Sequence, residues 1–203
     1  MWINGIEQST LAASDRGLQF GDGCFTTAAV LQGKILLLER HIQRLREGCE
    51  RLLINGIDWL QLENEMRQAA RDQRQAVLKV ILSAGSGGRG YSRKGGGEPT
   101  RIVSLAAWPQ HYADLQQRGA SLALSPIRLA RNPQFAGLKH LNRLEQVMIR
   151  LILTRQTPTK RWCLTLKVGW WNAVRPIYSG AGARRFLPLT CAGRASMALC
   201  DAV

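Results

Sequence analysis

The spacing of apolar residues in the first half of the chain constrains the fold most, because strand-like runs and amphipathic helical segments follow one another there. Residues 24–31 and 34–38 are apolar runs on either side of a Gln-Gly pair, which is typical of a hairpin turn. Residues 39–53 and 59–74 instead carry apolar side chains at helical spacing, and the Asn-Gly pair at 55–56 is expected to end the first helix. Strands and helices mixed in this order predict an α/β (α+β) fold.

The following residues continue the same mixture and suggest a second domain. Strands are expected at residues 77–82, 101–107 and 120–125, and a helix at residues 141–153. A Trp-Pro pair breaks the second of these strands, so residues 108–118 are expected to link two domains. The chain is therefore divided into a small N-terminal α/β domain (1–107), this linker, and the first part of a second domain (119–158).

The cysteines and the N-terminus bear on where the protein resides. The five cysteines show no CxxC spacing and are odd in number, so reduced thiols are expected and no metal site is indicated. The first seven residues have neither a basic start nor an apolar run, and no apolar stretch reaches the roughly 18 residues of a membrane span. We therefore expect a cytoplasmic protein with no membrane partner.

The net charge of +14 is concentrated in the last part of the chain. Residues 1–145 contain 19 basic and 13 acidic residues, whereas residues 146–203 contain 9 basic residues and one acidic residue, Asp201. A strong positive charge is typical of proteins that bind nucleic acid. Here the charge falls in a segment whose composition differs from that of the rest, so no nucleic-acid partner is expected.

Three features can carry chemistry, and each also has a purely structural interpretation. Residues 85–91 form a Gly-rich loop in which Arg89 can grip a carboxylate, or the loop is only a flexible turn. Lys139 follows an apolar stretch, where desolvation would favour the neutral amine that condenses with aldehydes, although most lysines are surface charges. Thr26 and Thr27 point to opposite faces of one strand, so only one of them can face a site.

The joint order of five motifs resembles the aminodeoxychorismate lyases, which belong to the class IV aminotransferase group of pyridoxal-phosphate enzymes. The motifs are Asp15-Arg16, Phe20–Thr27, His41–Leu45, Gly85–Tyr91 and Gly137–Gln146. The resemblance covers the chain from residue 1 to about residue 157. It implies a two-domain fold-type IV architecture, pyridoxal 5'-phosphate as cofactor, 4-amino-4-deoxychorismate as a small-molecule substrate, and a homodimer.

The resemblance also implies a role for each matching residue. Lys139 would hold the cofactor, Arg44 would bind its phosphate, and Asn142 would lie near its ring. Lys139 and Thr27 would be the catalytic residues, with Thr27 facing the substrate, and Arg89 would bind a substrate carboxylate. The implied reaction converts 4-amino-4-deoxychorismate to 4-aminobenzoate and pyruvate, a step in folate synthesis.

The resemblance stops after about residue 158, where the family has a carboxylate that pairs with the pyridine nitrogen and a second phosphate-binding turn. Permitted codons for Thr159–Tyr178 and Phe186–Cys200, read one nucleotide earlier, can encode segments that resemble both missing parts. We therefore predict a frameshift near residues 157–160, with residues 159–203 as an out-of-frame tail and an incomplete second domain. Weak or absent lyase activity is the expected consequence.

Two other functions stay open on the sequence alone. An aminotransferase of the same fold, acting on D- or branched-chain amino acids, would transfer an amino group to 2-oxoglutarate. A basic nucleic-acid-binding module would show steeply salt-dependent binding of DNA or RNA. This second alternative would use cationic residues of the tail, namely Lys160, Arg161, Arg175, Arg184, Arg185 and Arg194.

Overall fold

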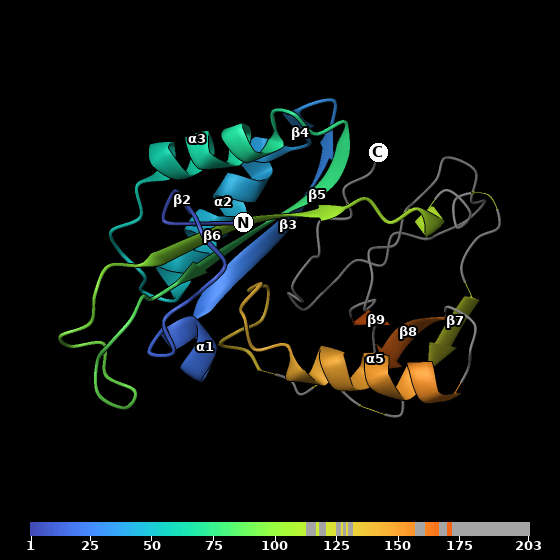
Figure 1. The fold of residues 1–203 in the computed structure, drawn as a ribbon. Helices are drawn as coiled ribbons and strands as arrows, with labels where there is room; N and C mark the ends of the chain where they lie inside the picture. The colour runs from blue at the N-terminus through green and yellow to red at the C-terminus, as the bar shows by residue number, and fades with distance from the viewer. Residues whose placement is uncertain are drawn as a thin grey trace. The chain divides into compact units, whose positions relative to one another are not determined.

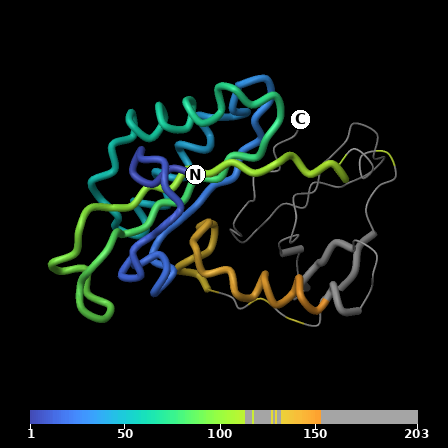
Figure 2. Tube along the Cα trace, in the orientation of Figure 1, coloured from blue at the N-terminus to red at the C-terminus, as the bar shows by residue number. Residues whose placement is uncertain are grey.

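The computed structural model divides the chain into two units, and each is considered by itself. The described residues are 1–112, 117, 121–124, 127, 129, 132–156, 161–166 and 170–171. The first unit contains Met1–Trp108 and Lys139–Asn142, and the second contains Pro109–Leu138 and the residues from Arg143 onward. The chain thus leaves the first unit after Trp108 and returns to it for one short segment, as Figure 2 shows.

The first unit is built on a six-stranded sheet in which the paired strands are antiparallel (Figure 1). The strands are β1 (Trp2–Ile3), β2 (Ile6–Glu7), β3 (Gly23–Leu31), β4 (Lys34–Ile35), β5 (Gln75–Ser83) and β6 (Thr100–Ala107), in the spatial order β2-β1-β6-β5-β3-β4. The helices are α1 (Arg16–Phe20), α2 (Leu38–Arg51) and α3 (Trp59–Ala70). This mixture confirms the expected α/β (α+β) class, and the β3–β4 hairpin forms where the sequence predicts it.

Alternation along the central strands separates a core face of the sheet from an opposite face. On β3 the even-numbered residues are buried, whereas Phe25 and Thr27 are only half-buried on the opposite face. Helices α2 and α3 pack on the core face, where Leu45, Leu62 and Met66 are fully buried. The core cluster also includes Cys24, Ala28, Val30, Leu38, Ile42, Cys49, Ile54, Ala69, Ala70, Ala76, Leu78, Val80, Leu82 and Val103.

Helix α2 begins and ends at other residues than the sequence predicts. The second hairpin strand stops at Ile35 because Leu37 takes a left-handed conformation with φ of 53° and α2 starts at Leu38. The helix ends at Arg51, ahead of the Asn-Gly pair, because Leu53 is left-handed with φ of 55°. The predicted end of the next helix is also wrong, since α3 stops at Ala70.

The second unit contains a parallel strand pair, one antiparallel strand and one described α-helix. Strand β7 (Ser121–Leu124) pairs in parallel with β8 (Arg161–Leu166), and β8 pairs antiparallel with β9 (Trp170–Trp171). Helix α5 (Leu144–Gln156) starts three residues later than predicted. Apart from β8 and β9, the tail predicted to be out of frame lies outside the described residues.

Two kinds of feature are missing from the described part of the chain. None of its helices combines the length and the apolar composition that a bilayer-crossing segment requires. Its His, Cys, Asp and Glu side chains form no group of three or more that could hold a metal ion.

Gly23 begins β3 at a point where a side chain has no room, so Gly23→Ala is expected to destabilise the first unit. An added β-carbon would overlap the Leu82 carbonyl oxygen and lie 2.8 Å from Leu141 Cδ1. Overpacking against backbone should lower the free energy of unfolding by about 2 kcal/mol. Hydrogen exchange of the β5 amides reports this loss.

Gly97→Ala is the matched control for this substitution. Its added β-carbon would meet only the Ser86 carbonyl oxygen, at an ordinary 3.5 Å. A change within about 0.5 kcal/mol is expected there. Equal losses in the two variants would contradict the steric explanation.

Candidate functional site

The segment around Lys139 is held against the edge of β3 by backbone hydrogen bonds. The Phe25 amide donates to the Lys139 carbonyl at 3.0 Å, and the Leu141 amide donates to the Gly23 carbonyl at 3.0 Å. Strand β4 pairs only with the far end of β3, so these donors and acceptors at its beginning are open to the returning chain. Because this segment is extended, the helix predicted from residue 141 cannot begin there.

The Lys139 side chain lies over an aromatic ring on the opposite face of the sheet. Lys139 is half-buried, and its Nζ lies 4.8 Å from the centroid of the Phe25 ring, a distance typical of a cation–π contact. Thr27 is two residues further along β3 and shares the face of Phe25. The structure thus places Lys139 and Thr27 on one side of the sheet.

Thr26 points to the other face of β3, as the strand alternation predicts. Its hydroxyl oxygen lies 2.7 Å from Nδ1 of His41, and both residues are completely buried. This hydrogen bond joins α2 to β3 within the core. Of the two threonines, only Thr27 is available to a site on the face of Lys139.

Arg44 and Asn142 belong to two segments that contact the beginning of β3. Arg44 is half-buried on α2 and precedes Leu45, whose carbonyl oxygen lies 4.0 Å from the Cys24 thiol sulfur. Asn142 is exposed, and its Nδ2 donates to the Gly21 carbonyl at 3.2 Å. Gly21 is the left-handed residue that ends α1, and a side chain there would overlap Asn142.

The Gly-rich loop is held by Arg16 rather than by Arg89. Arg16 is 3% exposed, and its guanidinium donates to three carbonyl oxygens of the loop and to that of the following Ser92. The acceptors are Gly87 at 3.4 Å, Gly90 at 3.3 Å, Tyr91 at 3.0 Å and Ser92 at 3.1 Å. Arg89 itself is exposed on this loop.

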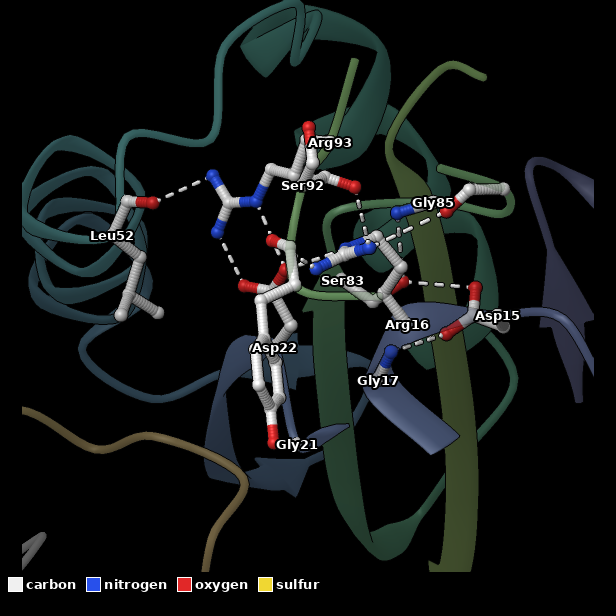
Figure 3. Close-up of polar contacts among 12 residues, drawn as sticks. Asp15, Arg16, Gly17, Gly21, Asp22, Leu52, Ser83, Gly85, Ser92 and Arg93 are labelled. Atoms are coloured by element: carbon white, nitrogen blue, oxygen red, sulfur yellow. Dashed lines mark hydrogen bonds and ion pairs between the residues drawn. The ribbon is translucent and has the colours of Figure 1, made fainter. Parts of the chain in front are cut away.

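Two arginines converge on Asp22 beside this loop (Figure 3). Arg16 Nε donates to Asp22 Oδ2 at 2.9 Å, Arg93 Nε donates to the same oxygen at 2.9 Å, and Arg93 Nη2 pairs with Oδ1. Arg93 Nη1 also donates at 2.8 Å to the carbonyls of Leu52 and Leu53. These contacts tie the loop, the start of β3 and the end of α2 together.

Opposing effects act on the Asp22 carboxyl group. Burial raises its pKa, but the hydrogen bonds and charges of Arg93 and Arg16 lower the pKa by more, so that the net shift is downward from 3.8. The carboxylate form of Asp22 is therefore favoured in the folded chain.

Asp15 is the second buried carboxylate near this loop. Its Oδ2 accepts hydrogen bonds from Ser83 Oγ at 2.9 Å and Thr100 Oγ1 at 2.8 Å, and its Oδ1 accepts from the Gly17 amide at 2.8 Å. Asp15 is 1% exposed and caps the N-terminus of α1. In the sequence, Asp15 and Asp22 stand in motifs of the family resemblance without an assigned role, and there is no signal for Arg93.

Cys24 and Cys49 form a buried thiol pair beneath this end of β3. Their sulfur atoms lie 4.0 Å apart, and both thiols are free. The hydrogen bond with Cys49 and burial raise the pKa of Cys24, whereas the contact with Cys24 lowers the pKa of Cys49 despite its burial. The Cys24 thiol is therefore protonated and takes part in packing rather than in nucleophilic chemistry.

The fold and the residues around β3 agree with one protein family. The sequence pattern of Amino-transferase class IV matches residues 23–167. The match covers more than half of the chain, which therefore belongs to the class IV aminotransferase family, and the predicted membership is confirmed. The match extends into residues 159–167, which belong to the tail predicted to be out of frame.

Two aminodeoxychorismate lyases are similar to this chain. The enzyme of Vibrio harveyi is 36% identical over 149 residues, which are 73% of this chain and 55% of that protein. The crystal structure of 4-amino-4-deoxychorismate lyase from Pseudomonas aeruginosa superposes with a TM-score of 0.77 and 38% identity, covering 85% of this chain and 64% of that one. The chain thus spans about half the length of the V. harveyi relative.

A more distant solved structure supports the fold-type IV assignment. The PLP-bound form of a hypothetical aminotransferase from Mycobacterium tuberculosis superposes with a TM-score of 0.70 at 20% identity, covering 83% of this chain and 61% of that one. At this identity the likeness concerns the fold alone. The fold-type IV architecture expected from the sequence is confirmed.

Proposed function

We propose that this chain is a pyridoxal-phosphate-dependent lyase that converts 4-amino-4-deoxychorismate to 4-aminobenzoate and pyruvate. One observation carries the proposal: the amine of Lys139 lies over the Phe25 ring, on the sheet face that also carries Thr27. The relatives from V. harveyi and P. aeruginosa, which are 36% and 38% identical to this chain, are both aminodeoxychorismate lyases. This favours the lyase reaction over amino-group transfer.

The chemistry of the side chains present fits pyridoxal 5'-phosphate. Its aldehyde requires a primary amine and its phosphate requires a cation, and Lys139 and Arg44 provide these two kinds of group on segments that contact the beginning of β3. Both residues are half-buried, so neither side chain is fully solvated. Lys139 would hold the cofactor covalently, Arg44 would bind the phosphate, and Asn142 would lie beside the ring.

The remaining work falls to the residues of the chain. When bound, pyridoxal 5'-phosphate supplies an electron sink for the bond that is broken at the amine-bearing carbon. Lys139 Nζ takes the proton from that carbon as general base. The Thr27 hydroxyl or Lys139 returns a proton to the departing enolpyruvyl group, while Arg89 binds a substrate carboxylate. Aromatisation of the ring drives the reaction, so the protein mainly orients the groups.

Reductive labelling tests this proposal directly. The purified chain is mixed with pyridoxal 5'-phosphate, reduced with borohydride and digested, and the modified peptide is identified by mass spectrometry. The modification is expected on Lys139. Labelling spread over surface lysines without preference for Lys139 would reject the proposed function.

The oligomeric state and the reading frame of the tail can be tested separately. The family resemblance favours a homodimer, which sedimentation of the purified chain measures. The charge distribution favours a frameshift near residues 157–160, and the encoding nucleotide sequence decides it. We expect turnover well below that of an intact relative, and equal turnover would contradict the predicted impairment.

A further inference from the structure

The central strands β3, β5 and β6 carry one charged side chain on the sheet face of Lys139 and Thr27. Strands β3, β5 and β6 are described completely, and of the residues that they contribute to this face only Lys79 is charged. The others are apolar, hydroxyl, amide or glycine residues: Gly23, Phe25, Thr27, Ala29, Leu31, Gln75, Val77, Ile81, Ser83, Thr100, Ile102, Ser104 and Ala106. A single lysine in the middle of a central strand is unusual for its residue type.

Lys79 lies directly beside the proposed catalytic residues. It pairs with Thr27 across the strands, and its Nζ lies 5.3 Å from the centroid of the Phe25 ring. Lys139 Nζ lies 4.8 Å from the same centroid. The two ammonium groups are therefore at most about 10 Å apart, which is the screening length at 0.1 M salt. An anion bound between them would be attracted by both charges.

The charge of Lys79 is not neutralised by a carboxylate in the described part of the chain. The ion pairs found there include those of Asp22 with Arg16 and Arg93, of Glu63 with Arg67, and of Glu65 with Arg101. Lys79 is exposed, and its ammonium group lies against the ring of Phe25. Its ammonium group can therefore accept an anionic partner from solution.

We propose that Lys79 Nζ binds a carboxylate of the substrate and thereby selects carboxylate-bearing amines. The inference rests on the proposed function for the identity of the substrate. It adds a specificity-determining cation to the site, on a rigid central strand, whereas Arg89 occupies an exposed loop. A lysine suits this role because its ammonium group forms charge-assisted hydrogen bonds with carboxylate oxygens.

Binding of the two carboxylate products, measured separately by calorimetry on the full chain, tests the inference. In Lys79→Met we expect the Kd of 4-aminobenzoate or of pyruvate to rise about tenfold, as the loss of one charge-assisted contact predicts. Lys79→Arg should restore the Kd to within about threefold because it keeps the charge. Aniline, which lacks a carboxylate, should bind the unmodified chain and Lys79→Met equally.

Lys34→Met is the matched control, since it removes the same charge from β4, the other strand that pairs with β3. Lys34 pairs with Leu31, four residues beyond Thr27 and thus about 13 Å away along β3. Its Kd values should equal those of the unmodified chain. Any one of three results overturns the inference. The Kd of both carboxylates changes less than threefold in Lys79→Met, the Kd of aniline changes as much as theirs, or the unmodified chain shows no measurable binding.

The two proposals fail in different ways. Labelling at Lys139 together with unchanged Kd values in Lys79→Met rejects the role of Lys79 alone. Absence of labelling at Lys139 rejects the proposed function, whatever the Kd values are.

Discussion

Replacing Lys139 with alanine is expected to abolish the covalent capture of pyridoxal 5'-phosphate. The aldehyde of the cofactor bonds to a primary amine, and alanine has none. Lys139→Arg should fail equally, because a guanidinium stays protonated and cannot form this bond. After borohydride reduction and digestion, mass spectrometry should detect no more labelled peptide in either variant than in a sample to which no cofactor was added.

Lys79→Ala is the control for this loss. Lys79 contacts the same aromatic ring as Lys139, so its removal disturbs the same neighbourhood. It should leave the labelling of Lys139 intact. If Lys139→Ala is still labelled as strongly as the unmodified chain, another amine holds the cofactor and the proposed role of Lys139 is wrong.

Asp22→Asn is expected to have the largest effect on stability. Asp22 accepts hydrogen bonds from Arg16 and Arg93, and the side chains of Arg16 and Asp22 are only 4% and 13% exposed. Removal of the carboxylate leaves the buried Arg16 cation without its counter-charge, which should cost about 3 kcal/mol of unfolding free energy. Urea unfolding, followed by hydrogen exchange of the β5 amides, measures this cost.

The control is Asp72→Asn, which removes a carboxylate from an exposed position after α3. Its effect should stay within about 0.5 kcal/mol. Similar losses in the two variants would show that net charge, rather than the contacts of Asp22, stabilises the first unit.

The pKa of Asp22 also predicts a pH dependence of stability. Because the folded-state pKa lies below the ordinary value of 3.8, folding favours the carboxylate form. Its contribution is fully present above that value and is lost as the pH falls through the folded-state pKa. Unfolding curves recorded downward from pH 6 should show a smaller acid-induced loss in Asp22→Asn than in the unmodified chain.

Long periodic elements could be predicted from the sequence, because their side chains follow one packing surface. The helical spacing of residues 39–53 predicts α2, whose Ile42, Leu45 and Cys49 lie in the core, although Leu53 is exposed, and the apolar run at 77–82 predicts β5. Element ends could not be predicted in the same way. Helix α2 stops where Leu53 turns into a left-handed conformation and Arg93 binds the carbonyls of Leu52 and Leu53. Such a contact joins residues about 40 positions apart and leaves no local pattern.

The candidate site shows the same division. Lys139, Arg44, Asn142, Thr27 and Arg89 were identified because their motifs resemble a family, and their roles stay predictions. Lys79 belongs to no such motif and becomes visible only through its pairing with Thr27 across the strands. The anchoring of the Gly-rich loop by Arg16 likewise depends on contacts between distant residues.

The return of the chain to β3 sets an order of events during synthesis. Strand β3 is made early, but the backbone groups at Phe25 and Gly23 find their partners only in Lys139 and Leu141. A nascent chain that has left the ribosome only as far as Trp108 therefore carries an unpaired strand edge, the kind of surface that recruits other chains. Protection of this edge begins only once the segment with the proposed cofactor lysine has emerged, so closure of the first unit and assembly of its site coincide.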